Sequence, residues 1–200
     1  DDYAFLVLDT PFIYHISMTF SYLEEAVAIN RAMIDLFWDE VNGGFFFTGK
    51  GDEKLVARSK EIYDGALPSG NSVAALNLVR LAMMTGDTEL ETRADTLTRT
   101  FSQHVAAYPA GHSQFLNALD FIVGPAMEVV IAGDPALEAT MEMVRLVRNR
   151  FLPNKVLLLR PEGDEGRRLS EIAPFVKELT PTNGKPTVFV CEQHTCKTPT

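Results

Sequence analysis

Residues 69–85 constrain the fold of this chain more than any other stretch, because they form a helical pattern that is apolar over most of its circumference. The stretch reads Ser-Gly-Asn-Ser-Val-Ala-Ala-Leu-Asn-Leu-Val-Arg-Leu-Ala-Met-Met-Thr and is followed by Gly86-Asp87. A helix of this kind is buried on several sides and therefore needs neighbours. Amphipathic patterns at 21–37 and 88–107 and a further apolar pattern at 112–123 supply them. This alternation predicts stacked helical hairpins.

The ends of these helices carry less regular signals. Ser21 is a candidate N-cap, with Glu24 three residues later as the partner of a capping box. Before it, Pro11 interrupts an apolar pattern, so we expect a helix that is kinked there or that starts again at Pro11. Gly44 to Thr48 is expected to be a short strand or extended segment, and Lys50 to Lys60 a charged surface loop.

The last third of the chain has a different texture, with short β-branched runs around one helical pattern. The three predicted strands are Met127 to Asp134, which closes in a turn, Lys155 to Leu159 and Thr187 to Cys191. A helix is predicted between the first two strands, at Pro135 to Arg150, and a charged loop follows the second strand, at Glu162 to Arg168. A strand–helix–strand unit with short links favours a parallel pair. We therefore predict a mainly α chain, with helical hairpins over residues 1–125 and a small α/β appendage over residues 126–200.

Composition excludes several classes of protein. The chain has 200 residues and a net charge of −9, which does not suit an anionic nucleic acid or membrane surface. No apolar run approaches the ~20 residues that span a bilayer. Two cysteines favour a reducing compartment and hence the cytoplasm. Because the chain starts at Asp1 rather than Met, we expect an N-terminal part to be missing.

Several motifs resemble a known family. They are Asp2-Tyr3-Ala4-Phe5, Phe37-Trp38-Asp39-Glu40 with Gly43 to Thr48, Tyr63 to Ser72, Glu128 to Gly133, and the closing Val190-Cys191 to Cys196 with Pro199. Together they are similar to the C-terminal part of the thioredoxin-domain-containing proteins related to spermatogenesis-associated protein 20. The stretch Asp-Gly-Ala-Leu-Pro-Ser-Gly-Asn-Ser at 64–72 is the most specific of them. The segment from Val7 to Tyr22 departs from the family, which continues an unbroken helix there.

The resemblance implies a larger architecture than this chain contains. Family members carry an N-terminal thioredoxin-like domain, which is absent here, followed by a six-hairpin (α/α) toroid similar to N-acylglucosamine 2-epimerases. The chain is then a partial toroid whose inner helices would expose apolar surface. We expect that face either to be buried in a homodimer or to repack as a compact helical layer.

In such a toroid the starts of the inner helices form the mouth of a cavity, where carboxylates and a histidine can perform acid–base chemistry on a sugar. Asp64 and His112 are the candidate catalytic residues. The candidate substrate-binding residues are Asp2, Tyr3, Tyr63, Ser69, Asn71 and Gln114. Structural alternatives stay open: Asp2, Ser69 and Asn71 fit helix caps, Asp64 fits a turn, His112 fits a capping position, and the tyrosines fit the core.

Cys191 and Cys196 lie five positions apart with His194 between them. Free thiols, a structural disulfide and a redox pair are all consistent with this spacing, whereas a metal site would need a further ligand. A redox link to a thioredoxin-like domain is the functional hypothesis for this pair.

Two functions therefore compete. The first is carbohydrate binding or acid–base processing, without a cofactor or metal. The second is a non-catalytic scaffold or interaction module that serves a thioredoxin-like redox partner. Convergence of Asp64, Asn71 and His112 in one open pocket would favour the first function, and simple helix capping would weaken it.

Overall fold

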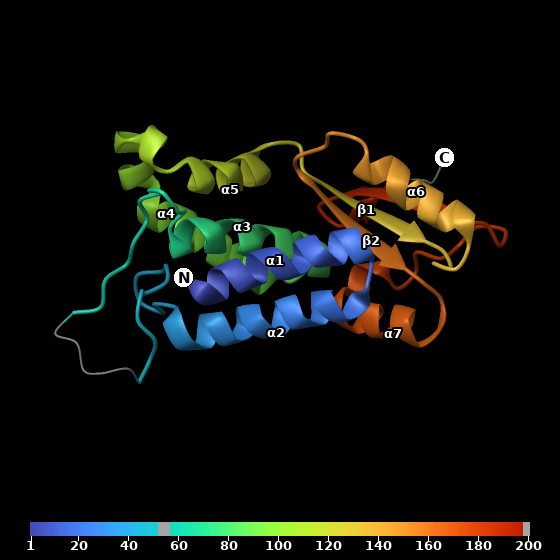
Figure 1. Ribbon diagram of the computed structural model, residues 1–200, viewed down its shortest axis with the longest axis horizontal. Helices are drawn as coiled ribbons and strands as arrows, with labels where there is room; N and C mark the ends of the chain where they lie inside the picture. The colour runs from blue at the N-terminus through green and yellow to red at the C-terminus, as the bar shows by residue number, and fades with distance from the viewer. Residues whose placement is uncertain (52–56, 198–200) are drawn as a thin grey trace. The chain divides into compact units, whose positions relative to one another are not determined.

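The computed structural model describes residues 1–51 and 57–197, and the chain divides into two compact units. One unit contains residues 1–80 and 88–123, and the other contains residues 81–87 and 124–200. The first is helical and the second is built around a small sheet (Figure 1). Pro199 and the middle of the predicted loop at 50–60 lie outside the described residues.

The helical unit contains the helices that the sequence predicts. Their bounds are α1 Asp2–Ser17, α2 Phe20–Phe37, α3 Gly70–Thr85, α4 Thr88–Ala107 and α5 Ser113–Val123, with a 3₁₀ turn at Pro109–Gly111. The end of α3, from residue 81 onward, is counted with the other unit. Helices α1 and α2 pack side by side as a hairpin (Figure 1). Along α3, Val73, Ala74 and Leu78 are fully buried, as expected for a helix that is apolar on most sides. The mainly helical prediction is therefore confirmed.

Helix α1 runs without interruption through Pro11, so the prediction of a restart there is wrong. Its last residue is followed by Met18 in a left-handed conformation, whose N–H donates to the Tyr14 carbonyl at 2.6 Å. A proline inside a helix removes one hydrogen bond and its ring crowds the carbonyl four residues earlier. Pro11 and the preceding Thr10 are both buried. The packing of α1 outweighs this local cost.

The predicted capping box at the start of α2 is also wrong. The helix begins one residue before Ser21, at Phe20, and its N-cap is Thr19, which makes no side-chain capping bond. Phe20 is buried, with 4% of its surface exposed. Burying that ring in the first turn therefore decides where the helix starts, rather than a capping hydroxyl.

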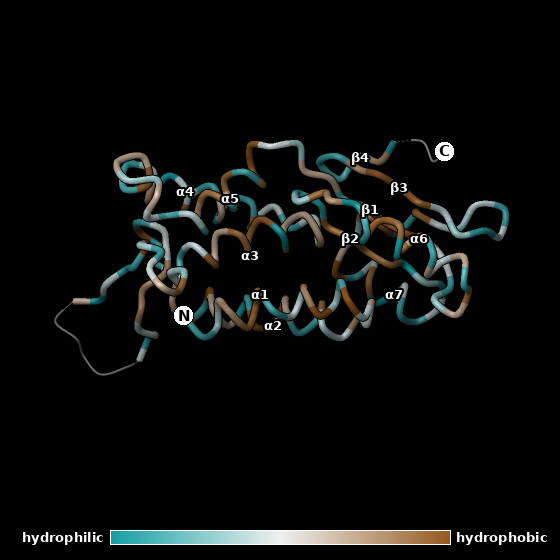
Figure 2. The backbone as a smooth tube through the Cα atoms, turned by 45° about the horizontal axis from the view of Figure 1, so that its top comes forward, coloured by the Kyte–Doolittle hydropathy of each residue, from teal (hydrophilic) through white to brown (hydrophobic). Residues whose placement is uncertain are grey.

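The second unit contains a sheet with the strand order β2-β1-β3-β4. The strands are β1 Met127–Ala132, β2 Lys155–Arg160, β3 Thr187–Glu192 and β4 Thr195–Cys196. Strands β1 and β2 are parallel, as predicted, and β3 is antiparallel to both of its neighbours. The core strands are strongly hydrophobic, and Figure 2 draws much of β3 in brown.

The helices of this unit differ from the prediction. Helix α6 covers Glu138–Arg148 rather than beginning at Pro135. The segment 162–168, predicted to be a loop, forms instead the N-cap, Glu162, and the first residues of helix α7, Gly163–Ile172. Only Gly166 and Leu169 of α7 are buried, so the helix has little apolar periodicity to reveal it. In the part of the chain that is described, no helix combines the length and apolarity needed to cross a membrane.

Candidate functional sites

Asp64 binds the starts of two helices at once. Its Oδ1 accepts a bond from the Ser69 N–H at 3.0 Å, beside the start of α3. Its Oδ2 accepts bonds from the N–H groups of Gln114 at 2.8 Å and Phe115 at 3.3 Å, in the first turn of α5. Helix N-termini present unpaired N–H groups and a partial positive charge, which a carboxylate satisfies. Both oxygens of the candidate acid are therefore used within the protein.

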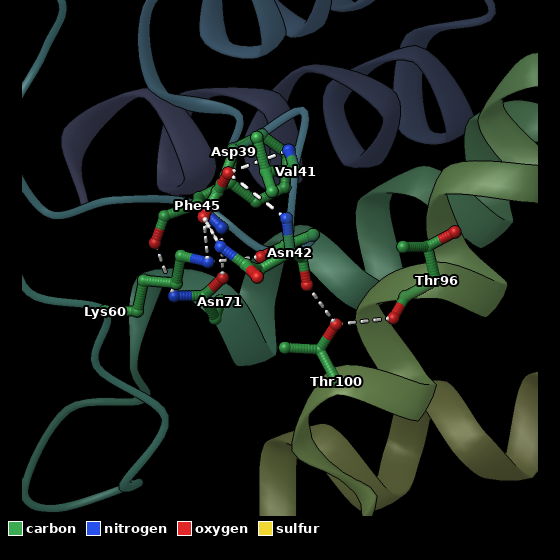
Figure 3. A network of polar contacts seen from close by, with 9 residues as sticks. Asp39, Val41, Asn42, Phe45, Lys60, Asn71, Thr96 and Thr100 are labelled. Carbon is green, nitrogen blue, oxygen red and sulfur yellow. Dashed lines mark hydrogen bonds and ion pairs between the residues drawn. The ribbon is translucent and has the colours of Figure 1, made fainter.

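Ser69 and Asn71 also bond to the protein itself. The Ser69 Oγ accepts a bond from the Ser72 N–H at 3.1 Å, which is an N-cap of α3. The Asn71 side chain is 4% exposed and holds two separate backbone segments. Its Oδ1 accepts from the Phe45 N–H at 2.7 Å and its Nδ2 donates to the Phe45 carbonyl at 2.9 Å (Figure 3). Its Nδ2 also donates to the Glu61 carbonyl at 2.8 Å. Asn71 thus links the backbone segments around Phe45 and Glu61 to helix α3.

His112 is 5% exposed and precedes the first residue of α5. Its Nδ1 lies 2.9 Å from the Ile62 carbonyl oxygen. A carbonyl can only accept, so Nδ1 carries the proton and Nε2 is the basic nitrogen of the neutral ring. The ring of Tyr63, which is 61% exposed, stands edge-on to His112 with 6.3 Å between centroids. His112 and Asp64 are thus near each other in the fold but bond to different groups.

Two of the predicted binding residues line a small cavity. Tyr3 and Asn71 line it together with Met33, Phe37 and Phe45. Its volume is about 30 Å³, whereas small-molecule sites usually reach ~300 Å³ or more. The Tyr3 ring packs against Phe37 with 5.5 Å between centroids.

Two further predicted residues make no cavity contact of this kind. Asp2 is exposed in the first turn of α1, whose N-cap is Asp1. Gln114 contributes its backbone N–H to Asp64, and its side-chain Oε1 accepts a bond from Asn117 at 3.2 Å. The structure therefore gathers Asp64, Ser69 and Gln114 around two helix ends and does not place them with Tyr3 and Asn71 around one large pocket.

An ion pair that the sequence does not single out organises the turn after α2. The Lys60 Nζ donates to Asp39 Oδ2 at 2.6 Å and to the Gly43 carbonyl at 2.5 Å (Figure 3). The N–H groups of Val41 and Asn42 donate to Asp39 Oδ1 at 2.9 and 3.2 Å. Lys60, more than any other group, lowers the pKa of Asp39 well below its usual range. Asp39 and Lys60 are 21 positions apart in the sequence, so no local sequence pattern predicts this ion pair.

Beside this turn lies an open groove of about 280 Å³. The Arg93 guanidinium covers the Trp38 ring at 5.2 Å and pairs with Glu89 at 2.7 Å and Glu40 at 3.6 Å. The charged groups on this rim thus already pair with one another.

The two cysteines form a disulfide across strands β3 and β4. Cys191 is fully buried, and Cys196 is half-buried. Glu128 of β1 pairs in register with Cys191 and is itself only 1% exposed. Its Oε1 lies 3.7 Å from His194 Nδ1, and its Oε2 accepts a bond from the His194 N–H at 3.4 Å. Sequence reasoning missed Glu128, whose only signal is an acidic residue at the start of a β-branched run.

Within residues 1–51 and 57–197, no group of three or more His, Cys, Asp or Glu side chains is arranged to hold a metal ion. The fold and these sites define a mainly α protein with a helical-hairpin unit and a small α/β unit that carries a hairpin disulfide. No protein-family model matches the chain.

The chain is similar over its whole length to spermatogenesis-associated protein 20. It is 34% identical to the protein from Rattus norvegicus over 200 residues and 34% identical to that from Homo sapiens over 203 residues. It is also 30% identical over 200 residues to an uncharacterized protein of Caenorhabditis elegans. The chain spans about a quarter of the length of these relatives (25% of the rat and human proteins).

Proposed function

We propose that the helical unit is a non-catalytic interaction module that docks through an apolar face of α1. This face, here called the α1 face, consists of Leu6, Phe12, Ile13 and Ile16, which are 51%, 59%, 38% and 60% exposed. A helix turns by about 100° per residue, so these positions gather on one side of it. Clusters of large exposed apolar side chains mark interaction surfaces more often than isolated ones do.

A second copy of this chain is the occupant to which the proposal commits. Closed two-fold pairs are the commonest oligomers, and they bury the same face of each copy. Burying a large apolar side chain completely contributes roughly 1.5–3 kcal/mol, so half-exposed ones contribute about 1 kcal/mol each. Two copies of the α1 face then provide about 8 kcal/mol, which exceeds the lower estimates of the cost of association, about 4 kcal/mol, by about 4 kcal/mol. The expected pairing is weak, with a Kd of about 1 mM.

Sedimentation velocity over a wide concentration range tests this docking. The wild-type sedimentation coefficient should rise at the highest concentrations, and Phe12→Ala should lose that rise, since about 2 kcal/mol is lost per pair and pairing then needs about thirtyfold more protein. Phe151→Ala is the matched control, because Phe151 is 92% exposed and lies outside the α1 face. A wild-type chain that stays monomeric at every concentration refutes self-docking, and equal shifts in the two variants refute the α1 face.

The proposal that this module also acts together with a thioredoxin-like redox partner is supported by the family resemblance alone.

Acid–base chemistry on a carbohydrate is the second candidate, and one observation favours it. The bond from His112 to Ile62 leaves Nε2 as a basic nitrogen, next to the exposed ring of Tyr63. Against it, the Asp64 carboxylate is occupied by two helix ends. A panel of sugars tested by thermal shift on wild type and on His112→Gln separates the two functions. Stabilisation of wild type alone would support a sugar site.

A further inference from the structure

The Cys191–Cys196 disulfide closes the hairpin of strands β3 and β4. The two cysteines are register partners, and the tight turn between the strands is formed by Gln193 and His194, both with positive φ. The Lys197 N–H donates to the Val190 carbonyl at 3.0 Å. Because bonded and non-bonded pairs alternate along an antiparallel ladder, the cysteines occupy the non-bonded position, where facing side chains are closest. The backbone alone therefore holds the hairpin in the register that brings the sulfurs together.

The disulfide joins residues only five positions apart. A cross-link stabilises a fold mainly by closing a loop of the unfolded chain, and the effect is smallest for short loops. The turn and the ladder bonds already fix the hairpin. Stability is therefore a weak physical reason for this bond.

The two sulfurs differ in their access to a partner. Cys191 is 0% exposed, and Cys196 is half-buried at the end of the short edge strand β4. In thiol–disulfide exchange, the sulfur that an incoming thiolate can reach is attacked and the other sulfur leaves. Access thus makes Cys196 the attacked sulfur and Cys191 the leaving group.

Glu128 lies next to the leaving group. It is the cross-strand partner of Cys191, and directly opposite residues of a sheet project from the same face with Cβ atoms about 5 Å apart. Glu128, Cys191 and Cys196 therefore form a row across strands β1, β3 and β4. Burying a carboxyl group is costly, yet Glu128 is 1% exposed on the same face of β1 as Val130, which is fully buried.

His194 completes this arrangement from the hairpin turn. It contacts both oxygens of Glu128, and its ring packs on Phe175 with 4.8 Å between centroids. The turn that brings the cysteines together thus also places an ionisable pair beside them.

We propose that Cys191 and Cys196 form a thiol–disulfide exchange site for an external dithiol, in which Cys196 is attacked, Cys191 leaves, and the Glu128–His194 pair supplies the proton to the leaving sulfur. This inference goes beyond the α1 face and is independent of it. The substrate class is a molecule or domain with two neighbouring thiols.

The electrons and atoms balance in two steps. A thiolate of the dithiol forms a bond to the Cys196 sulfur as the Cys191–Cys196 bond breaks, and the electron pair passes to Cys191. The Cys191 sulfur takes a proton from the Glu128–His194 pair, which regains one from solvent. The second thiol of the partner then loses its proton to solvent and attacks the partner's own sulfur in the mixed disulfide. The bond to Cys196 breaks, and the Cys196 thiolate takes a proton from solvent. The partner ends oxidised to a disulfide, and this chain ends with two thiols.

A wild-type experiment tests the direction of attack. A thiol count of the oxidised protein with and without reductant first establishes the disulfide, and two free thiols in the oxidised protein would overturn the proposal. Brief reaction with glutathione, acid quenching and cleavage after Glu192 then place the two cysteines in separate peptides for mass spectrometry. We expect the glutathione adduct on Cys196. An adduct on Cys191, or one shared equally, would contradict the assignment.

The Glu128→Gln variant tests the proton donor, because glutamine keeps the shape but cannot supply the proton. Reduction by dithiothreitol should be at least about tenfold slower than in wild type. In a denaturing concentration of guanidinium chloride, both proteins should be reduced at the same rate. Glu192→Gln is the matched control, since Glu192 is exposed and pairs with Lys197 instead. Equal folded-state rates for wild type and Glu128→Gln would remove Glu128 from the mechanism, and should that variant not fold, the glutathione experiment still decides the site.

Discussion

Replacing Asn71 by alanine should destabilise the helical unit more than any other single loss of a polar side chain on α3. The substitution removes three hydrogen bonds, to the N–H and carbonyl of Phe45 and to the Glu61 carbonyl. Phe45 is 5% exposed, so water cannot replace Asn71 at its two backbone groups, whereas Glu61 is exposed. An unsatisfied buried backbone group costs about 1–3 kcal/mol. We therefore expect a loss of about 4 kcal/mol, a large part of the 5–15 kcal/mol that keeps a typical domain folded.

Asn77→Ala is the matched control for this prediction. Asn77 lies on the same helix and is 3% exposed, but it makes a single bond, from Nδ2 to the Ala4 carbonyl at 2.7 Å. Its loss should cost about 1–2 kcal/mol. The difference between the two variants therefore isolates the bonds to residues 45 and 61 from the general effect of shortening a buried asparagine.

Urea denaturation followed by tryptophan fluorescence measures both variants. The chain has one tryptophan, Trp38, which is 4% exposed and packs edge-on against Phe45 with 5.0 Å between centroids. Its emission therefore reports on the region that Asn71 holds. If Asn71→Ala proves no less stable than Asn77→Ala, the three-bond role assigned to Asn71 is refuted.

Three further predictions concern other parts of the chain. Because Lys60 lowers the pKa of folded Asp39, this pair should stabilise the fold above the unfolded pKa of about 4 and lose that effect as the pH falls below it. Asp39→Asn should then flatten the fall of the urea midpoint on acidification, and an unchanged pH profile would count against the ion pair. Gly166→Ala should cost at least about 2 kcal/mol in thermal unfolding, because its Cβ would overlap the Pro161 carbonyl oxygen, whereas Gly65→Ala should be nearly neutral. No sugar in a thermal-shift panel should raise the Tm, since the small cavity beside Tyr3 admits about two water molecules and the Asp64 carboxylate is bonded to two helix ends, and a reproducible rise would support the carbohydrate function.

The helices and the parallel strand pair could be predicted because their signals are local. Apolar spacing identifies α3 and α4, and a β-branched run identifies β1. Helix α7 cannot be predicted from apolar spacing because only Gly166 and Leu169 of the helix are buried. The rest of its sequence is mostly charged and resembles a loop. The start of α2 was misplaced because the burial of Phe20 outweighs a capping hydroxyl.

The candidate sites could be predicted less well, for a different reason. The sequence indicates that Ser69 and Asp64 are polar residues near helix starts, but the bond from Gln114 to Asp64 spans 50 positions of sequence. The same holds for Glu128, which becomes notable only when the register of β1 and β3 sets it opposite Cys191. Periodicity describes one segment at a time, whereas these contacts depend on the fold that joins the segments.

The double bonding of Asp64 has a consequence for how the helical unit opens. One carboxylate holds backbone amides at the start of α3 and at the start of α5. When the segment around Asp64 detaches, both helix ends lose their partner in the same event. The amide hydrogens of Ser69 and Gln114 should therefore exchange with solvent through one shared opening, although they are far apart in the chain. Helices α3 and α5 would then fray at their N-termini as one cooperative element, with Asp64 as the residue that sets its free energy.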